Sequence, residues 1–138
     1  MSERDGKRIL VVDDDEQVRR LLGRLLERAG YKYRLEEGAD AARLALEKQS
    51  FDLVLCDVHM PGGSGFSLMR DLLVERPDIP TVMVTGMNLP ELSEIAAEYG
   101  ASGFVPKPFD ADQVLSVIKR ALSGTRSPAL AAGAETSR

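Results

Sequence analysis

Residues 9–15 read ILVVDDD and residues 51–57 read FDLVLCD, two short apolar runs that each end in acidic residues. Short runs rich in β-branched residues, separated by a helical pattern, are typical of buried parallel strands, whose carboxyl ends share one edge of a sheet. We therefore expect Asp13, Asp14 and Asp57 to lie close together. Carboxylates without counter-charges repel one another and raise pKa values, so the cluster indicates a site for a hard cation such as Mg2+.

The composition fits one domain with one core. The chain has 138 residues, is 43% hydrophobic and has a formal net charge of -4, which does not favour direct nucleic-acid binding. Cys56 is the only cysteine, so no internal disulfide can form, and no apolar run approaches the roughly 18 residues that span a bilayer. Residues 1–8 are polar and lack the apolar core of a signal peptide. We expect a cytoplasmic protein with no membrane partner.

Strand and helix patterns alternate along the rest of the chain. Besides the two apolar runs, the pattern predicts a polar edge strand at 31–36, a buried strand at 80–85 and a short strand at 103–105. Helical spacing of apolar residues predicts helices over 18–29, 39–48, 66–73, 88–99 and 111–122. Five consecutive βα units predict an α/β fold, a doubly wound parallel sheet with helices on both faces. Ligands of such sheets bind beyond the carboxyl ends of the strands.

Five separated motifs resemble those of the receiver domains of two-component response regulators. They are Val11-Val12-Asp13-Asp14, Asp57, Met60-Pro61-Gly62, Thr85-Gly86 and Lys107-Pro108-Phe109. The resemblance covers about residues 7–123 and implies a flavodoxin-like, five-stranded sheet in the order 2-1-3-4-5 with five helices. We predict a receiver domain over residues 1–123. Residues 124–138 lack a periodic apolar face and are interpreted as a disordered tail or linker stub.

The resemblance implies a phosphoacceptor and a metal site. Asp57 would accept a phosphoryl group from the phosphohistidine of a sensor histidine kinase, or from a phosphotransfer protein. Asp14 would bind Mg2+ or Mn2+ directly and Asp13 largely through water, with Asp57 and the backbone carbonyl of His59 as further ligands. The protein would then be a switch that assists its own phosphorylation and dephosphorylation, and not an enzyme.

The resemblance also implies how the switch is read. Thr85 and Lys107 would stabilise the phosphoryl oxygens, and movement of Thr85 would be coupled to rotation of Phe104. The surface of the fourth helix, fifth strand and fifth helix would change and control a downstream partner or output domain. A homodimer through this surface is expected by analogy. The bond between Lys107 and Pro108 is a candidate cis peptide bond.

Two side chains are predicted at the rim of the phosphoryl site. His59 follows Asp57 by two positions, and Met87 follows Thr85 by two positions. We hypothesise that both limit attack by water on the aspartyl phosphate; the alternative is that they are rim residues without this role. Cys56 should point away from Asp57 into the core, because side chains alternate along a strand.

Other functions are weighed against the switch. Asp13-x-Asp15 resembles the first motif of haloacid-dehalogenase-type phosphatases, with Asp13 as nucleophile, but Gln17 departs from that motif and the length leaves no room for a cap domain. Flavin or dinucleotide binding would need a glycine-rich loop where this chain has acids. A dimerisation module that has lost phosphorylation is the third alternative. Singly, Asp15 could be a helix cap and Phe104 a fixed core residue.

Overall fold

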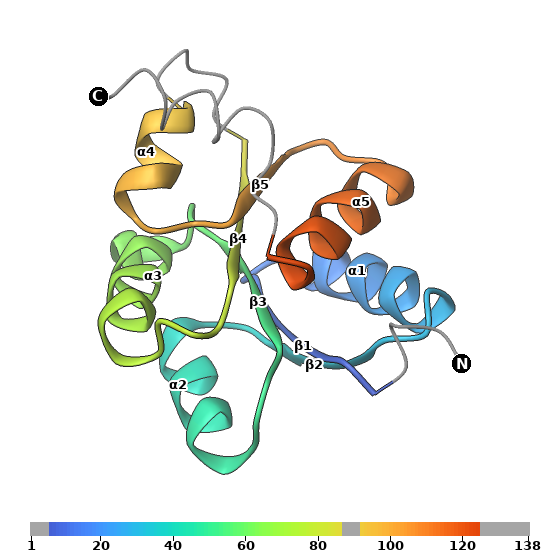
Figure 1. The fold of residues 1–138 in the computed structure, drawn as a ribbon, viewed down its shortest axis with the longest axis horizontal. Coiled ribbons are helices and arrows are strands. Elements are labelled where there is room, and N and C mark those ends of the chain that lie inside the picture. Colours follow the sequence, from blue (N-terminus) through green and yellow to red (C-terminus); the bar gives the residue numbers. More distant parts are fainter. Residues whose placement is uncertain (1–5, 87–91, 125–138) are drawn as a thin grey trace.

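The computed structural model describes residues 6–86 and 92–124 and contains a five-stranded parallel sheet in the order β2-β1-β3-β4-β5 (Figure 1). The strands are β1 (Arg8–Val12), β2 (Lys32–Glu36), β3 (Leu53–Asp57), β4 (Thr81–Thr85) and β5 (Gly103–Pro106). The helices are α1 (Glu16–Arg28), α2 (Ala39–Lys48), α3 (Ser64–Glu75), α4 (Leu92–Glu98) and α5 (Ala111–Leu122), and a short 3-10 helix, η1 (Pro61–Gly63), precedes α3. The predicted doubly wound fold and strand order are confirmed.

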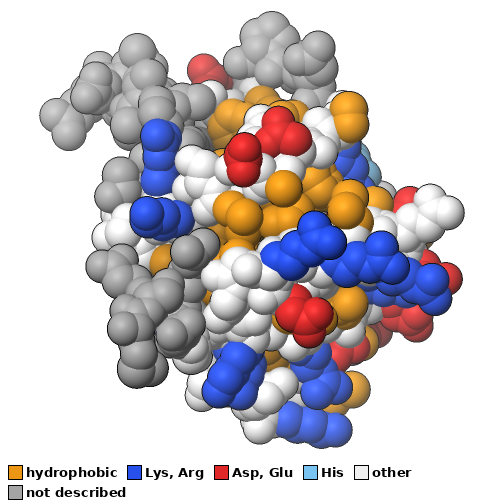
Figure 2. Space-filling model, turned by 90° about the vertical axis from the view of Figure 1, so that its right-hand side faces the viewer, with side chains coloured by type: hydrophobic (Ala, Val, Ile, Leu, Met, Phe, Trp, Pro, Cys, Tyr) orange, Lys and Arg blue, Asp and Glu red, His pale blue; other side chains and the backbone are white. Residues whose placement is uncertain are grey.

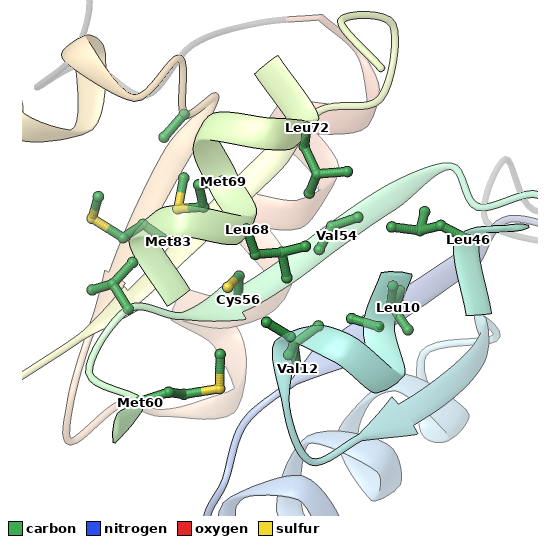
Figure 3. Packing of buried hydrophobic residues seen from close by; sticks show 14 of the residues in the cluster. Leu10, Val12, Leu46, Val54, Cys56, Met60, Leu68, Met69, Leu72 and Met83 are labelled. Carbon is green, nitrogen blue, oxygen red and sulfur yellow. The ribbon is translucent and has the colours of Figure 1, made fainter. Parts of the chain in front are cut away.

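Each face of the sheet has its own core, because successive residues of a strand point to opposite faces. Ile9 and Val11 of β1 pack in the core beneath α1 and α5, whereas Leu10 and Val12 pack in the core beneath α2, α3 and α4. Figure 3 shows the second of these cores, with Cys56 at its centre. Cys56 is fully buried there, which confirms that its side chain points away from the strand-end acids.

The face covered by α1 and α5 leaves part of its apolar surface in contact with solvent. Figure 2 shows apolar side chains gathered on this side of the molecule, crossed by basic side chains. A groove between the two helices is lined by Leu21, Arg24, Leu25, Arg28, Phe109, Ala111 and Leu115. Leu21 is 51% exposed, so α1 does not bury its whole apolar stripe against the sheet.

The start of α3 differs from the prediction. The sequence pattern predicts a helix over 66–73, but the helix begins at Ser64 and Gly65 is buried in its first turn. An ideal Cβ at this position would lie 2.3 Å from the backbone oxygen of Asp57. Gly65 therefore lets the helix approach the end of β3 closely, and is not a helix breaker here.

The two helices that follow β1 and β5 each begin at a residue whose side chain caps the helix. Asp15 caps α1, because its Oδ1 accepts hydrogen bonds from the backbone N–H groups of Gln17 at 2.8 Å and Val18 at 3.3 Å. Asp110 caps α5 by accepting from the N–H of Gln113 at 2.8 Å. These contacts satisfy N–H groups that have no partner within the helix.

Three sequence-based predictions lie outside the described residues: the start of the fourth helix at residue 88, the rim position of Met87, and the tail beyond residue 124. In the part of the chain that is described, every helix is too short or too polar to cross a bilayer.

Candidate metal centre

Four strand ends bring the predicted site residues to one edge of the sheet. Asp13 follows β1, Asp57 ends β3, Thr85 ends β4 and Lys107 follows β5. The backbone N–H of Lys107 donates to the carbonyl oxygen of Thr85 at 2.8 Å, which holds the start of the β5–α5 loop beside β4. The strand order therefore places residues that are far apart in the sequence around one point.

Three carboxylates converge at this edge. One oxygen from each of Asp13, Asp14 and Asp57 lies within 4.8 Å of the other two. Asp13 is 1% exposed and Asp57 is 2% exposed, whereas Asp14 is open to solvent. The N–H of Asp15 donates to Oδ1 of Asp13 at 2.9 Å, so the side chain of Asp13 has a defined orientation.

Lys107 is the cation that partly neutralises this cluster. Its Nζ atom lies 3.2 Å from Oδ2 of Asp13 and 3.4 Å from Oδ2 of Asp57. Partial burial alone would lower the pKa of the Lys107 ammonium, but the negative charges of Asp13 and Asp57 outweigh it and raise this pKa. Lys107 is therefore held in its charged form between the two buried carboxylates.

The negative charge of the Asp13 carboxylate is only partly compensated by neighbouring groups of the protein. Burial raises the pKa of its carboxyl group, and the charge of Asp57 adds to the rise, although the N–H of Asp15 and Lys107 oppose it. Among the described residues no hydrogen bond of good geometry reaches the buried Oδ2 atom of Asp13, despite its 3.2 Å contact with Lys107. A buried acceptor without a hydrogen bond costs free energy, so this atom is suited to a further cation.

The donor set fits Mg2+. Within residues 6–86 and 92–124, three carboxylates face one ammonium group, which leaves an excess of negative charge at the site. Hard divalent cations prefer carboxylate and carbonyl oxygens and do not require sulfur or nitrogen ligands. Asp13, Asp14 and Asp57 are the side chains that could hold such an ion.

His59 makes two contacts at the site. Its backbone N–H donates to Oδ1 of Asp57 at 2.9 Å, and its ring Nε2 lies 2.7 Å from Oγ1 of Thr85. The sequence pattern predicts that this side chain lies at the rim of the phosphoryl site, but it gives no indication of the contact with Thr85. The only available signal was the position of His59, two residues beyond the end of β3, because the partner lies 26 residues away.

The remaining predicted residues lie near the same edge. The Lys107–Pro108 peptide bond is cis. Phe104 of β5 is half-buried and packs against the core beneath α2, α3 and α4. Asp15, which a haloacid-dehalogenase-type site would place among the acids, is exposed and caps α1 instead. That arrangement counts against the phosphatase alternative.

Comparison with known proteins identifies the family. The model of the response regulator receiver domain matches residues 9–119. This chain belongs to the response regulator receiver family. The receiver domain is a signalling domain of two-component systems, and its family binds Mg2+ at an acidic pocket. This chain has an acidic cluster of Asp13, Asp14 and Asp57 at its strand ends.

Similar proteins include longer regulators. The receiver domain is 36% identical over 118 residues to the DNA-binding transcriptional regulator NtrC of Rhizobium meliloti, covering 86% of this chain and 24% of that protein. It is 34% identical to the protein of the same name in Proteus hauseri, again with 86% of this chain and 25% of that protein covered. The chain thus spans about a quarter of the length of these relatives.

Solved structures agree with this assignment. The chemotaxis response regulator CheY4 of Vibrio cholerae is 27% identical with a TM-score of 0.77, covering 83% of this chain and 98% of that one. NtrX of Brucella abortus is 34% identical with a TM-score of 0.79, covering 85% of this chain and 27% of that one. The receiver fold is therefore similar both to a receiver-sized protein and to one part of a larger protein.

Proposed function

We propose that this receiver domain accepts a phosphoryl group on Asp57, in a Mg2+-dependent reaction, from a sensor histidine kinase or a phosphotransfer protein. The observation that carries the proposal is the setting of Asp57. Its carboxylate is buried at the end of β3, 3.4 Å from the ammonium of Lys107, with oxygens of Asp13 and Asp14 within 4.8 Å. A carboxylate that is fixed and surrounded by further charged groups is suited to accept a phosphoryl group.

Phosphoryl transfer depends mainly on alignment and on neutralising the charge of the phosphoryl oxygens. The N–H of His59 and the ammonium of Lys107 hold the two oxygens of Asp57, which limits the orientations of the nucleophile. Lys107 is positioned to pair with a phosphoryl oxygen once the group is attached. Mg2+ held by Asp13, Asp14, Asp57 and the carbonyl of His59 would supply the remaining positive charge.

The proposed readout begins at Thr85. Phosphorylation adds at least about one negative charge to Asp57, and the Thr85 hydroxyl would donate a hydrogen bond to the new oxygens. The space that Thr85 leaves would be filled by Phe104, which changes the surface of α4, β5 and α5. Because phenylalanine has no hydroxyl group, Phe104 would contact a partner only through apolar atoms. Such a switch needs two packings that differ by a few kcal/mol.

The partner of this surface is a further part of the proposal. The relatives named NtrC are DNA-binding transcriptional regulators, and only about a quarter of their length matches this chain. We propose that the receiver domain controls an output domain or a separate protein, and does not itself contact nucleic acid. A homodimer through α4, β5 and α5 is one form that this control could take.

The test is the intact mass after incubation with Mg2+ and acetyl phosphate or phosphoramidate. The expected result is a single base-labile phosphoryl adduct that requires Mg2+ and is lost in Asp57→Asn. The matched control is Asp78→Asn, because Asp78 is exposed and precedes β4 at the opposite edge of the sheet. An adduct that persists in Asp57→Asn, or the absence of any adduct with the unaltered protein, would contradict the proposal.

A further inference from the structure

His59 connects two groups that the proposed switch must bring together. Its backbone N–H donates to Oδ1 of Asp57, and its ring Nε2 is 2.7 Å from Oγ1 of Thr85. Thr85 is fully buried, whereas His59 is exposed and is therefore able to leave this contact without disrupting the core. A heavy-atom distance of 2.7 Å lies at the short end of the range for side-chain hydrogen bonds.

We propose that the His59 imidazole is a latch that holds the Thr85 hydroxyl in the resting arrangement and opposes activation. The inference rests on the proposed function and adds to it the residue that sets the balance between the two states. Thr85 must bond a phosphoryl oxygen in the active state, and it bonds the imidazole in the structure described above. The two hydrogen bonds therefore compete for one side chain.

The competition depends on which nitrogen of the imidazole carries the proton. When Nε2 is unprotonated, it accepts the single proton of the Thr85 hydroxyl, and that proton is then not available to a phosphoryl oxygen. When Nε2 carries a proton, it donates to Oγ1, and this bond lasts only while Oγ1 stays within reach of the ring. The latch therefore requires an unprotonated Nε2, because a hydroxyl that accepts from Nε2–H keeps its own proton for a phosphoryl oxygen.

The size of the effect follows from a single hydrogen bond. A net contribution typical of one intramolecular hydrogen bond shifts a two-state equilibrium by about fivefold. Removal of the latch should therefore strengthen binding of a phosphoryl analogue by about fivefold. A side chain that only shields the site from water would change the rate of hydrolysis but would not change this equilibrium.

The experiment measures equilibrium binding of beryllium trifluoride, a tetrahedral analogue of the phosphoryl group, by fluorine NMR or calorimetry at saturating Mg2+. Three variants are compared with the unaltered protein: His59→Asn, His59→Leu and His59→Gln. The amide of glutamine reaches about as far as Nε2 of histidine, whereas the amide of asparagine is too short to reach Thr85. Asparagine and leucine should tighten binding by about fivefold, and glutamine should retain the original affinity.

A double substitution tests whether the effect passes through Thr85. In a Thr85→Val background, where the hydroxyl is absent, His59→Leu should no longer change the affinity for beryllium trifluoride. Unchanged or weaker binding by His59→Leu, or a gain that persists with Thr85→Val, would overturn the latch. If the unaltered protein neither binds the analogue nor forms the Asp57 adduct, the proposed function itself fails, and the latch fails with it.

Discussion

Gly65 couples the packing of α3 to the geometry of the phosphoacceptor strand. A Cβ atom at this position would lie 2.3 Å from the backbone oxygen of Asp57 and 2.7 Å from Cα of Val58. Both of these are backbone atoms, so no side-chain rotation can relieve the clash. We predict that Gly65→Ala destabilises the domain and displaces the end of β3 that carries Asp57.

The expected magnitude follows from these distances. The shorter contact is about 1 Å closer than ordinary van der Waals contact, so α3 and the end of β3 would have to separate by a comparable amount. Overpacking of this kind costs about 1–3 kcal/mol, while alanine would regain under about 1 kcal/mol of helix propensity. Because the clash is with backbone on two residues, we expect a net loss of about 2 kcal/mol, a large part of a typical domain stability.

Urea unfolding followed by circular dichroism measures this loss directly. The matched control is Gly38→Ala, because Gly38 caps α2 in an extended conformation and an added Cβ there would meet no atom within 4 Å. The urea midpoint should fall by about 1 M or more for Gly65→Ala and much less for Gly38→Ala. Equal losses of stability in the two variants would refute the reasoning, because they would show that the close approach of α3 is not required.

Two further predictions concern buried groups near the same strand end. Asp13→Asn should resist urea better than the unaltered protein in metal-free buffer at pH 7, because burial and Asp57 raise the pKa of Asp13 and its ionised form therefore lowers stability above that pKa. The difference should shrink as the pH falls from the raised pKa towards the ordinary value of 3.8 and be absent below it, and a constant difference at all pH values would contradict this cause. The thiol of Cys56 is fully buried, and burial together with the charges of Asp57 and Asp13 raises its pKa. It should react with a disulfide reagent at least about a thousandfold more slowly in native protein than in urea, whereas rapid native labelling would show that the core opens locally.

Much of the fold could be predicted because the patterns that specify it are local. The apolar runs ending at Val12 and Asp57 have the length and composition of buried strands, and both were found as strands. The N-cap role of Asp15 also depends only on residues within one turn of helix. The start of α3 was predicted incorrectly, because the role of Gly65 depends on its distance from β3 and not on its neighbours in the sequence.

The sequence by itself determined which residues end or directly follow the strands, and therefore that Asp13, Asp57, Thr85 and Lys107 would share one edge of a parallel sheet. Only the tertiary structure decided how these groups pair: Lys107 between two buried carboxylates, and His59 bonded to Thr85. The physical reason is that side chains alternate between the two faces of a strand, and this alternation is visible within a few residues of sequence. A contact between residues 59 and 85 depends on strand order, loop conformation and rotamers, which no local pattern encodes.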